Sequence, residues 1–246
     1  MDSAASSPVV PGPRPVTTEW PAVDHLVPAA EPNSDAFVDA AALRSGQLPD
    51  AVLAELHGFA TRPPACGALL LDGLPLGHLP PTPPTPWGHI EKDLTSDFIL
   101  LSVAHVLGHP MGYAAESRGV LTPHIVPTPG ETYRQVSTSS EVDLVFHTEG
   151  SYAHHKPRYL LLLCLRGDPT AATTLAPVAA ILPRLDEHTR QVLSQPRFRI
   201  AVDETYVEPG ERRLTPPLAA LAGDPGDPRI VFDANGPCIR RDGSKE

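Results

Sequence analysis

The chain has 246 residues, of which 41% are hydrophobic and 20% are charged, so it can bury a sizeable core in one large domain or two small ones. Its formal net charge of -10 argues against a phosphate backbone as the main partner. Its 31 prolines argue against a helical bundle, because each interior proline removes a hydrogen bond and clashes with the preceding turn.

Neither a membrane span nor a disulfide framework is expected. The longest apolar run, residues 159–165, is too short to cross a bilayer and is interpreted as a strand buried on both faces, with Cys164 as an inert core residue. The three cysteines lie far apart without a CxxC pair, and the N-terminus lacks the apolar stretch of a secretory signal. We therefore expect a cytoplasmic protein.

The first third of the chain predicts an arm followed by helices. Residues 1–33 are rich in Pro and Ala without periodicity, which favours a flexible or loosely docked arm. Residues 34–46 predict a helix capped by Ser34 or Asp35, and a second helix begins at Pro49. A short strand follows at 67–71, and the proline-rich residues 79–86 predict an extended loop.

The rest of the chain is mostly strand-like after a third helix, which Thr95, Ser96 and Asp97 are expected to cap. A helix is expected at residues 182–193. Strands are expected at residues 120–125, 144–147, 159–166, 197–202 and 230–232. Early helices and late strands indicate an α+β chain built on an antiparallel sheet or barrel, with residues 34–246 as one domain.

The chemistry concentrates in residues 146–174, because the usual nucleotide, serine-hydrolase and zincin signatures are absent. His147 and Glu149 stand two apart, so on a strand both side chains point to the same face. Such a pair can hold one metal ion, and a second histidine from elsewhere would complete the facial triad that suits non-haem Fe(II). The alternative is an ordinary histidine beside a surface carboxylate.

The surroundings of this pair resemble the clavaminate synthase-like branch of the Fe(II)/2-oxoglutarate-dependent oxygenases. The matching features are the HTE motif, Pro157, Tyr159, the CLR ending at residues 164–166 and a nearby threonine. The stretches DGLPLGHLPPTP and LGHPMGYAAESRGVLTPHIVP, and STSS before the motif, are also similar to the branch. The resemblance covers residues 50–235 and implies a double-stranded β-helix, a jelly-roll or cupin-like core, decorated by N-terminal helices.

The resemblance also implies roles for particular residues. His147 and Glu149 are expected to bind iron, and Thr173 or Thr174 is expected to hydrogen-bond the 2-oxoglutarate carboxylate. Glu116 matches the residue that pairs with the substrate's α-ammonium group.

Ser137 stands where a serine contacts the substrate carboxylate. The alternatives are a solvated loop residue at 116 and a turn residue at 137. His154 and His155 are interpreted as loop residues, because neighbours on a strand point to opposite faces. His105 and His109 predict one half-buried and one exposed side chain near a helix end.

Two family features are missing from the sequence. The branch needs a later histidine to close the iron site and an arginine for 2-oxoglutarate, but the last histidine is His188, on an expected helix. Only 99 residues follow His147, and the late arginines Arg240 and Arg241 lack a recognisable context. We therefore expect that the chain ends early and lacks the last strands of the barrel.

The expected function is Fe(II)- and 2-oxoglutarate-dependent hydroxylation, with O₂, of a free L-amino acid resembling arginine or asparagine, at the β-carbon, in specialised metabolism such as antibiotic biosynthesis. The expected partner is that small molecule, without nucleic acid or membrane, and the oligomeric state is left open. The alternative is a non-catalytic remnant that binds an amino acid or a partner protein without turnover. A hydrolase using His147 is a weaker option, because no nucleophile motif accompanies it.

Overall fold

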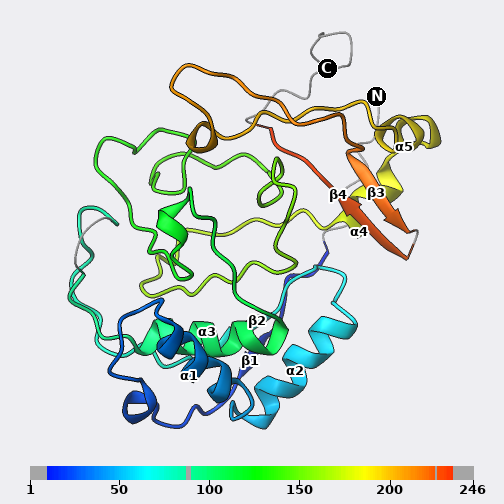
Figure 1. The fold of residues 1–246 in the computed structure, drawn as a ribbon. Coiled ribbons are helices and arrows are strands. Elements are labelled where there is room, and N and C mark those ends of the chain that lie inside the picture. The colour runs from blue at the N-terminus through cyan, green and yellow to red at the C-terminus, as the bar shows by residue number, and fades with distance from the viewer. Residues whose placement is uncertain (1–9, 87–89, 225, 235–246) are drawn as a thin grey trace.

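The computed structural model describes residues 10–86, 90–224 and 226–234. Three helices gather on one side of the molecule, the middle of the chain forms long irregular segments across its centre, and a hairpin with two short helices lies at one end (Figure 1). In these ranges no helix has the length and apolar character needed to cross a membrane. Cys238, Arg240 and Arg241 lie outside the described residues.

The three predicted N-terminal helices are confirmed as α1 (Asp35–Ser45), α2 (Asp50–Thr61) and α3 (Thr95–Leu107). The Ser34 hydroxyl accepts a hydrogen bond from the Phe37 amide at 3.3 Å and caps α1 as expected. The predicted cap of α3 is wrong, because Thr95, Ser96 and Asp97 form its first turn. The carboxylate of Asp93 lies just before that turn and accepts from the Thr95 amide at 3.0 Å.

The core sits between these helices, and α3 belongs to both of its clusters. One cluster joins α1 to α3, where the Phe37 and Phe98 rings meet edge to face with centroids 5.7 Å apart. The other joins α2 to α3. The buried members of the two clusters are Phe37, Ala41, Phe98 and Leu101, and Leu48, Val52, Leu56 and Val103. Burial on both sides of α3 makes it the central element of this layer.

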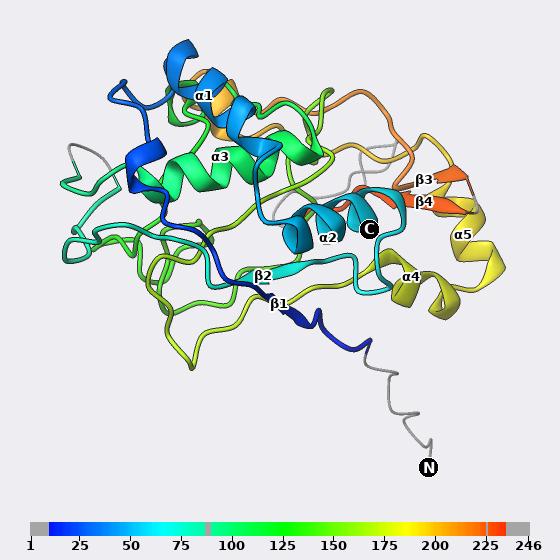
Figure 2. The same ribbon diagram turned by 90° about the horizontal axis from the view of Figure 1, so that it is seen from below.

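A parallel pair of short strands lies against α2 and α3 (Figure 2). β1 (Pro15–Thr17) pairs in register with β2 (Leu70–Asp72), so a part of the expected N-terminal arm is docked. Val23 is also almost fully buried, just before a short 3-10 helix at Asp24–Leu26. The boundary between this arm and the domain that follows, at residue 33, stays a prediction.

The prediction of regular strands in the second half of the chain is mostly wrong. Among the described residues, the late ladder is the hairpin of β3 (Leu221–Asp224) and β4 (Asp227–Ile230). Isolated antiparallel bridges join His147 to Asp233, Phe198 to Leu218 and Ala201 to Leu214. The segments at 120–125 and 159–166 form no ladder there, because an apolar sequence becomes a strand only where a neighbour accepts its hydrogen bonds.

Residues 159–165 are buried on one face instead of two. Leu161 packs on the cluster between α2 and α3, while Leu160 and Leu162 are 61% and 64% exposed. Cys164 is exposed as well, so its interpretation as a core residue is wrong. The alternation shows an extended chain with only one packed side.

The single helix predicted at residues 182–193 is also wrong. The chain forms α4 (Val178–Ile181), a 3-10 turn at Leu182–Arg184 and α5 (Glu187–Leu193). Pro183 lies in the 3-10 turn, where a continuing α-helix would lose a hydrogen bond. Two further 3-10 turns, at Ser117–Gly119 and Glu204–Tyr206, interrupt the irregular segments.

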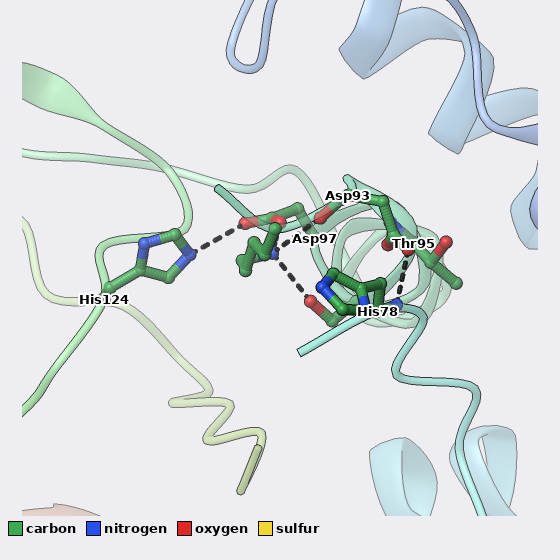
Figure 3. A network of polar contacts seen from close by, with 7 residues as sticks. His78, Asp93, Thr95, Asp97 and His124 are labelled. Carbon is green, nitrogen blue, oxygen red and sulfur yellow. Dashed lines mark hydrogen bonds and ion pairs between the residues drawn. The ribbon is translucent and has the colours of Figure 1, made fainter. Parts of the chain in front are cut away.

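A polar network fastens two loops to the start of α3 (Figure 3). The Lys92 ammonium contacts the Asp97 carboxylate, and both side chains are nearly buried. His124 Nε2 lies 3.4 Å from the same carboxylate, which brings the loop after residue 120 to the helix. Asp93 accepts a hydrogen bond from the His78 amide and so ties in the proline-rich loop.

Candidate functional site

The HTE motif is held in place by its middle residue. The Thr148 amide donates to the Phe232 carbonyl at 2.7 Å, and the Phe232 amide donates to the Thr148 hydroxyl at 3.1 Å. These bonds reach across 84 residues of sequence and align His147 opposite Asp233. Strand-like pairing therefore fixes the backbone of the motif. The side chains of His147 and Glu149, on either side of Thr148, lie at the surface.

His147 and Glu149 are both exposed side chains. The Nδ1 atom of His147 lies 2.9 Å from the Val145 carbonyl. A carbonyl only accepts, so in the neutral ring Nδ1 carries the proton and Nε2 keeps a lone pair that can bind a metal ion. Glu149 lies in the turn that follows, and the nearby buried Ser151 hydroxyl is 3.4 Å from the Asp233 carboxylate.

Glu116 lies in a cluster of tyrosines. The hydroxyls of Tyr152 and Tyr206 each donate to its Oε1 atom at 2.7 Å. The Tyr152 and Tyr206 rings pack with centroids 5.4 Å apart, and Tyr113 meets Tyr206 edge to face at 6.4 Å. Glu116 is half-buried, so it is not the solvated loop residue that was the alternative.

Tyr113 lies between the tyrosine cluster and the HTE motif. Its hydroxyl donates to the His155 carbonyl at 2.6 Å. Burial raises the pKa of Tyr113, and the nearby carboxylates of Glu116 and Glu149 raise it further. Since Glu149 belongs to the motif and Glu116 to the cluster, the two carboxylates share one neighbourhood.

The phenols that hold Glu116 are neutral donors. Burial, and then the hydrogen bond to Glu116, raise the pKa of Tyr152 well above its usual range. The same two causes raise the pKa of Tyr206. Both groups therefore stay protonated at neutral pH and keep donating to the carboxylate.

The other residues expected at the site make no hydrogen bond or ion pair with Glu116 or with the HTE motif in the part of the chain that the structure describes. Ser137, Thr173 and Thr174 are exposed, and their side chains make no hydrogen bond within the described ranges. Ser137 lies in a loop that closes on itself, where the Ser139 hydroxyl donates to the Thr132 carbonyl at 2.8 Å. Their expected roles stay predictions.

The two closely spaced histidine pairs lie as expected. His154 and His155 are exposed, with ring centroids 4.7 Å apart. His105 is half-buried and His109 is exposed. Burial lowers the pKa of His105, and the neighbouring His109 lowers it further.

One depression of about 540 Å³ lies between the start of α1 and the loop at residues 119–121, and no candidate residue lines it. It is lined by Asn33, Asp35, Val38, Asp39, Gly119 and Leu121. None of these residues was expected to bind a ligand.

Comparison with known proteins identifies the family, although no family model matches the chain. The chain is 33% identical over 207 residues to L-asparagine oxygenase of Streptomyces coelicolor, covering 82% of this chain and 61% of that protein. It is 34% identical over 206 residues to clavaminate synthase 2 of Streptomyces clavuligerus, covering 80% and 62%. A crystal structure of asparagine oxygenase with Fe(II), 3-hydroxyasparagine and succinate superposes with a TM-score of 0.75 at 30% identity, covering 90% of this chain and 73% of that one.

The chain belongs to the clavaminate synthase-like branch of the Fe(II)/2-oxoglutarate-dependent oxygenases. It spans about three fifths of the length of the two curated relatives. In this family setting the exposed Nε2 of His147 and the carboxylate of Glu149 are suitable iron donors. The described residues nevertheless contain no group of three or more His, Cys, Asp or Glu side chains that could hold a metal ion. The described residues therefore do not complete a three-ligand site.

The tyrosines around Glu116 are not predicted by the sequence. Tyr152 stands five residues after His147, inside the segment already singled out, so its position was a usable signal. Tyr206 meets Glu116 across 90 residues of sequence, and no motif surrounds it. Only the fold reveals that contact.

Proposed function

We propose that this protein takes part in the Fe(II)- and 2-oxoglutarate-dependent hydroxylation of a free L-amino acid resembling asparagine or arginine, at the β-carbon, in specialised metabolism. The observation that carries the proposal is the position of Tyr113. Its hydroxyl lies beside Gly150, the residue after Glu149, and its ring contacts Tyr206, which holds Glu116. One carboxylate belongs to a metal-binding motif, and the other is suited to an ammonium group. The similarity to L-asparagine oxygenase supports asparagine as the first substrate to test.

In this proposal the iron donors are His147 through Nε2 and Glu149 through its carboxylate. The bond from Nδ1 to the Val145 carbonyl fixes the tautomer and the ring orientation that such a ligand needs. The metal, 2-oxoglutarate and O₂ would supply the oxidising chemistry, and the protein would supply binding and orientation.

The remaining roles follow the same family pattern. Glu116 would pair with the α-ammonium group of the substrate, and Ser137 would contact its α-carboxylate. Thr173 or Thr174 would donate to a 2-oxoglutarate carboxylate. The support for the last three residues is the sequence resemblance alone.

The proposal extends to the architecture. The mixture of helices and short strands, and the superposition on asparagine oxygenase, support residues 34–246 as one domain on a double-stranded β-helix core. Two free cysteines among the described residues fit a reducing cytoplasm.

The decisive experiment is an assay of the chain with Fe(II), 2-oxoglutarate, O₂, ascorbate and single free amino acids. The expected result is succinate together with a product one oxygen atom heavier than the amino acid, detected by mass spectrometry. His147→Ala should abolish both products, while His154→Ala, which changes an exposed histidine seven residues away, should leave them unchanged.

A second candidate function is amino-acid binding without turnover. The Glu116 carboxylate favours it, because this carboxylate is held by two phenols and suits an ammonium group whether or not a metal ion is bound. Calorimetry together with the succinate assay separates the two functions. Asparagine binding in the calorimeter without succinate in the assay would establish binding without turnover. Iron binding that is unchanged in His147→Ala would show that the metal site lies elsewhere.

A further inference from the structure

The two oxygens of the Glu116 carboxylate have different surroundings. Oε1 accepts from both Tyr152 and Tyr206, which fills its two lone-pair directions. Oε2 accepts no hydrogen bond from any residue that the structure describes. One oxygen is thus used to hold the side chain, and the other is left for a ligand.

We propose that Tyr152 and Tyr206 are positioning residues that hold Glu116 by Oε1 and so present Oε2 to the ammonium group of the substrate. This inference rests on the proposed function, in which the substrate is a free α-amino acid. It assigns to the two phenols a role in recognition that acts through Glu116.

The three side chains come from three separate parts of the chain. Glu116 precedes the 3-10 turn at Ser117–Gly119, Tyr152 follows the HTE motif, and Tyr206 ends the turn at Glu204–Tyr206. The ring contacts among Tyr113, Tyr152 and Tyr206 restrict the rotamers of the phenols that donate to Glu116. A carboxylate fixed in this way needs little ordering when a ligand arrives, which strengthens binding.

The charge of the cluster suits a cation. No Lys, Arg or His side chain pairs with Glu116 in the described ranges, as the ion pairs there join other residues. Neutral phenols hold the carboxylate without cancelling its charge, which an arginine in the same place would do. Aromatic rings also attract an ammonium group through their faces. The site therefore combines an uncompensated negative charge with an aromatic lining.

The first experiment compares two probes that differ only in the ammonium group. L-Asparagine and its des-amino analogue succinamate are titrated by calorimetry into the wild-type chain, Tyr152→Phe, Tyr206→Phe and the double variant. We expect each single change to weaken asparagine binding about fivefold, and the double change more than about tenfold, because the carboxylate loses the bonds that hold it ready for the ammonium group. Succinamate binding should stay as it is. Tyr133→Phe is the matched control, because that ring is 80% exposed.

The second experiment tests whether the phenols act through Glu116. In a Glu116→Gln background, the same Tyr→Phe changes should alter asparagine affinity by less than about twofold, because the charge that they position is gone. Thermal melting of each variant identifies any loss of folding. A purely structural role would weaken both probes equally and would persist in the Gln background.

The outcomes separate this inference from the proposed function. Suppose the wild-type chain binds asparagine more tightly than succinamate and the Phe variants keep the same ratio of affinities. The positioning role is then wrong, and the proposed function stands. If wild type binds neither asparagine nor any other free amino acid in preference to its des-amino analogue, the proposed substrate class is wrong, and the positioning role is wrong with it.

Discussion

The helical layer and the segment at residues 112–176 are held together by different forces. In the helical layer Phe37 and Phe98 are fully buried, and α3 packs on both of its neighbours. In the second region Phe146 is 53% exposed, and separate polar contacts such as those of Glu116 and Thr148 fix the chain. The candidate site lies on this second region. The layer thus provides a rigid support, and the chemistry is placed on loops beside it.

The largest expected effect is the loss of an aromatic ring from the packed layer. Phe98→Ala should lower the free energy of unfolding by about 3–5 kcal/mol, because it leaves a cavity beside Phe37. Phe146→Ala removes the same atoms from an exposed position and should change the free energy of unfolding by less than about 0.5 kcal/mol. Urea denaturation followed by circular dichroism measures both. Equal losses would show that the second region is packed as tightly as the first.

The next effect concerns ion pairs. Lys92→Met leaves the nearly buried Asp97 without its main cation and should cost about 3 kcal/mol of unfolding free energy. The exposed pair of Arg134 and Glu131 in the second region is the control, and Arg134→Met should cost at most about 1 kcal/mol. If the two variants unfolded at the same urea concentration, Lys92 and Asp97 would not be a buried pair in solution.

The same network predicts a dependence on pH. Burial alone would raise the pKa of Asp97, but the polar contacts with His124, Lys92 and Thr122 hold it below its usual value. The ionised carboxylate therefore adds stability above a pH of about 4, and this stability is lost as the pH falls through the lowered pKa. Asp97→Asn should thus be less stable than wild type at pH 7, with a difference that shrinks as the pH falls below about 4. Melting temperatures across this range test it, and a constant difference would contradict the assignment.

The smallest expected effect is that of a helix cap. Ser34→Ala removes the acceptor for the Phe37 amide and should cost about 1 kcal/mol. Ser137→Ala, in the second region, removes a hydroxyl without a partner among the described residues and should change stability by less than about 0.5 kcal/mol. Parallel urea titrations compare the two serines. A larger loss at residue 137 would reveal a structural contact there.

Local signals in the sequence predicted the helical layer well. Ser34 and Gly46 mark the ends of α1, and the apolar periodicity of α2 is visible without any knowledge of its neighbours. The cap of α3 was misplaced, because Thr95, Ser96 and Asp97 are all good caps and only the fold shows that Asp93 serves instead. Pro183 is itself a local signal that a single helix cannot run through residues 182–193, because an interior proline removes a helical hydrogen bond.

Strands and the site depend on contacts between distant residues, so the sequence predicted them less well. An apolar run such as residues 159–165 does not reveal which neighbour, if any, accepts its hydrogen bonds. The HTE motif was recognisable because its residues are adjacent in sequence. The contact of Glu116 with Tyr206 was not, because its two partners share no local pattern.

The parallel pairing of β1 with β2 has a consequence for the order of events during synthesis. Pro15 pairs with Leu70, so the first strand leaves the ribosome 55 residues before its partner exists. At a translation rate of about 5–20 residues per second, that interval lasts roughly three to ten seconds. Throughout it the residues of β1 lack their strand partner, and for its first part they also lack α2, which ends at Thr61. The unpaired strand therefore persists for a time that is long compared with helix formation, and the pairing of β1 with β2 must follow the folding of the helices between them.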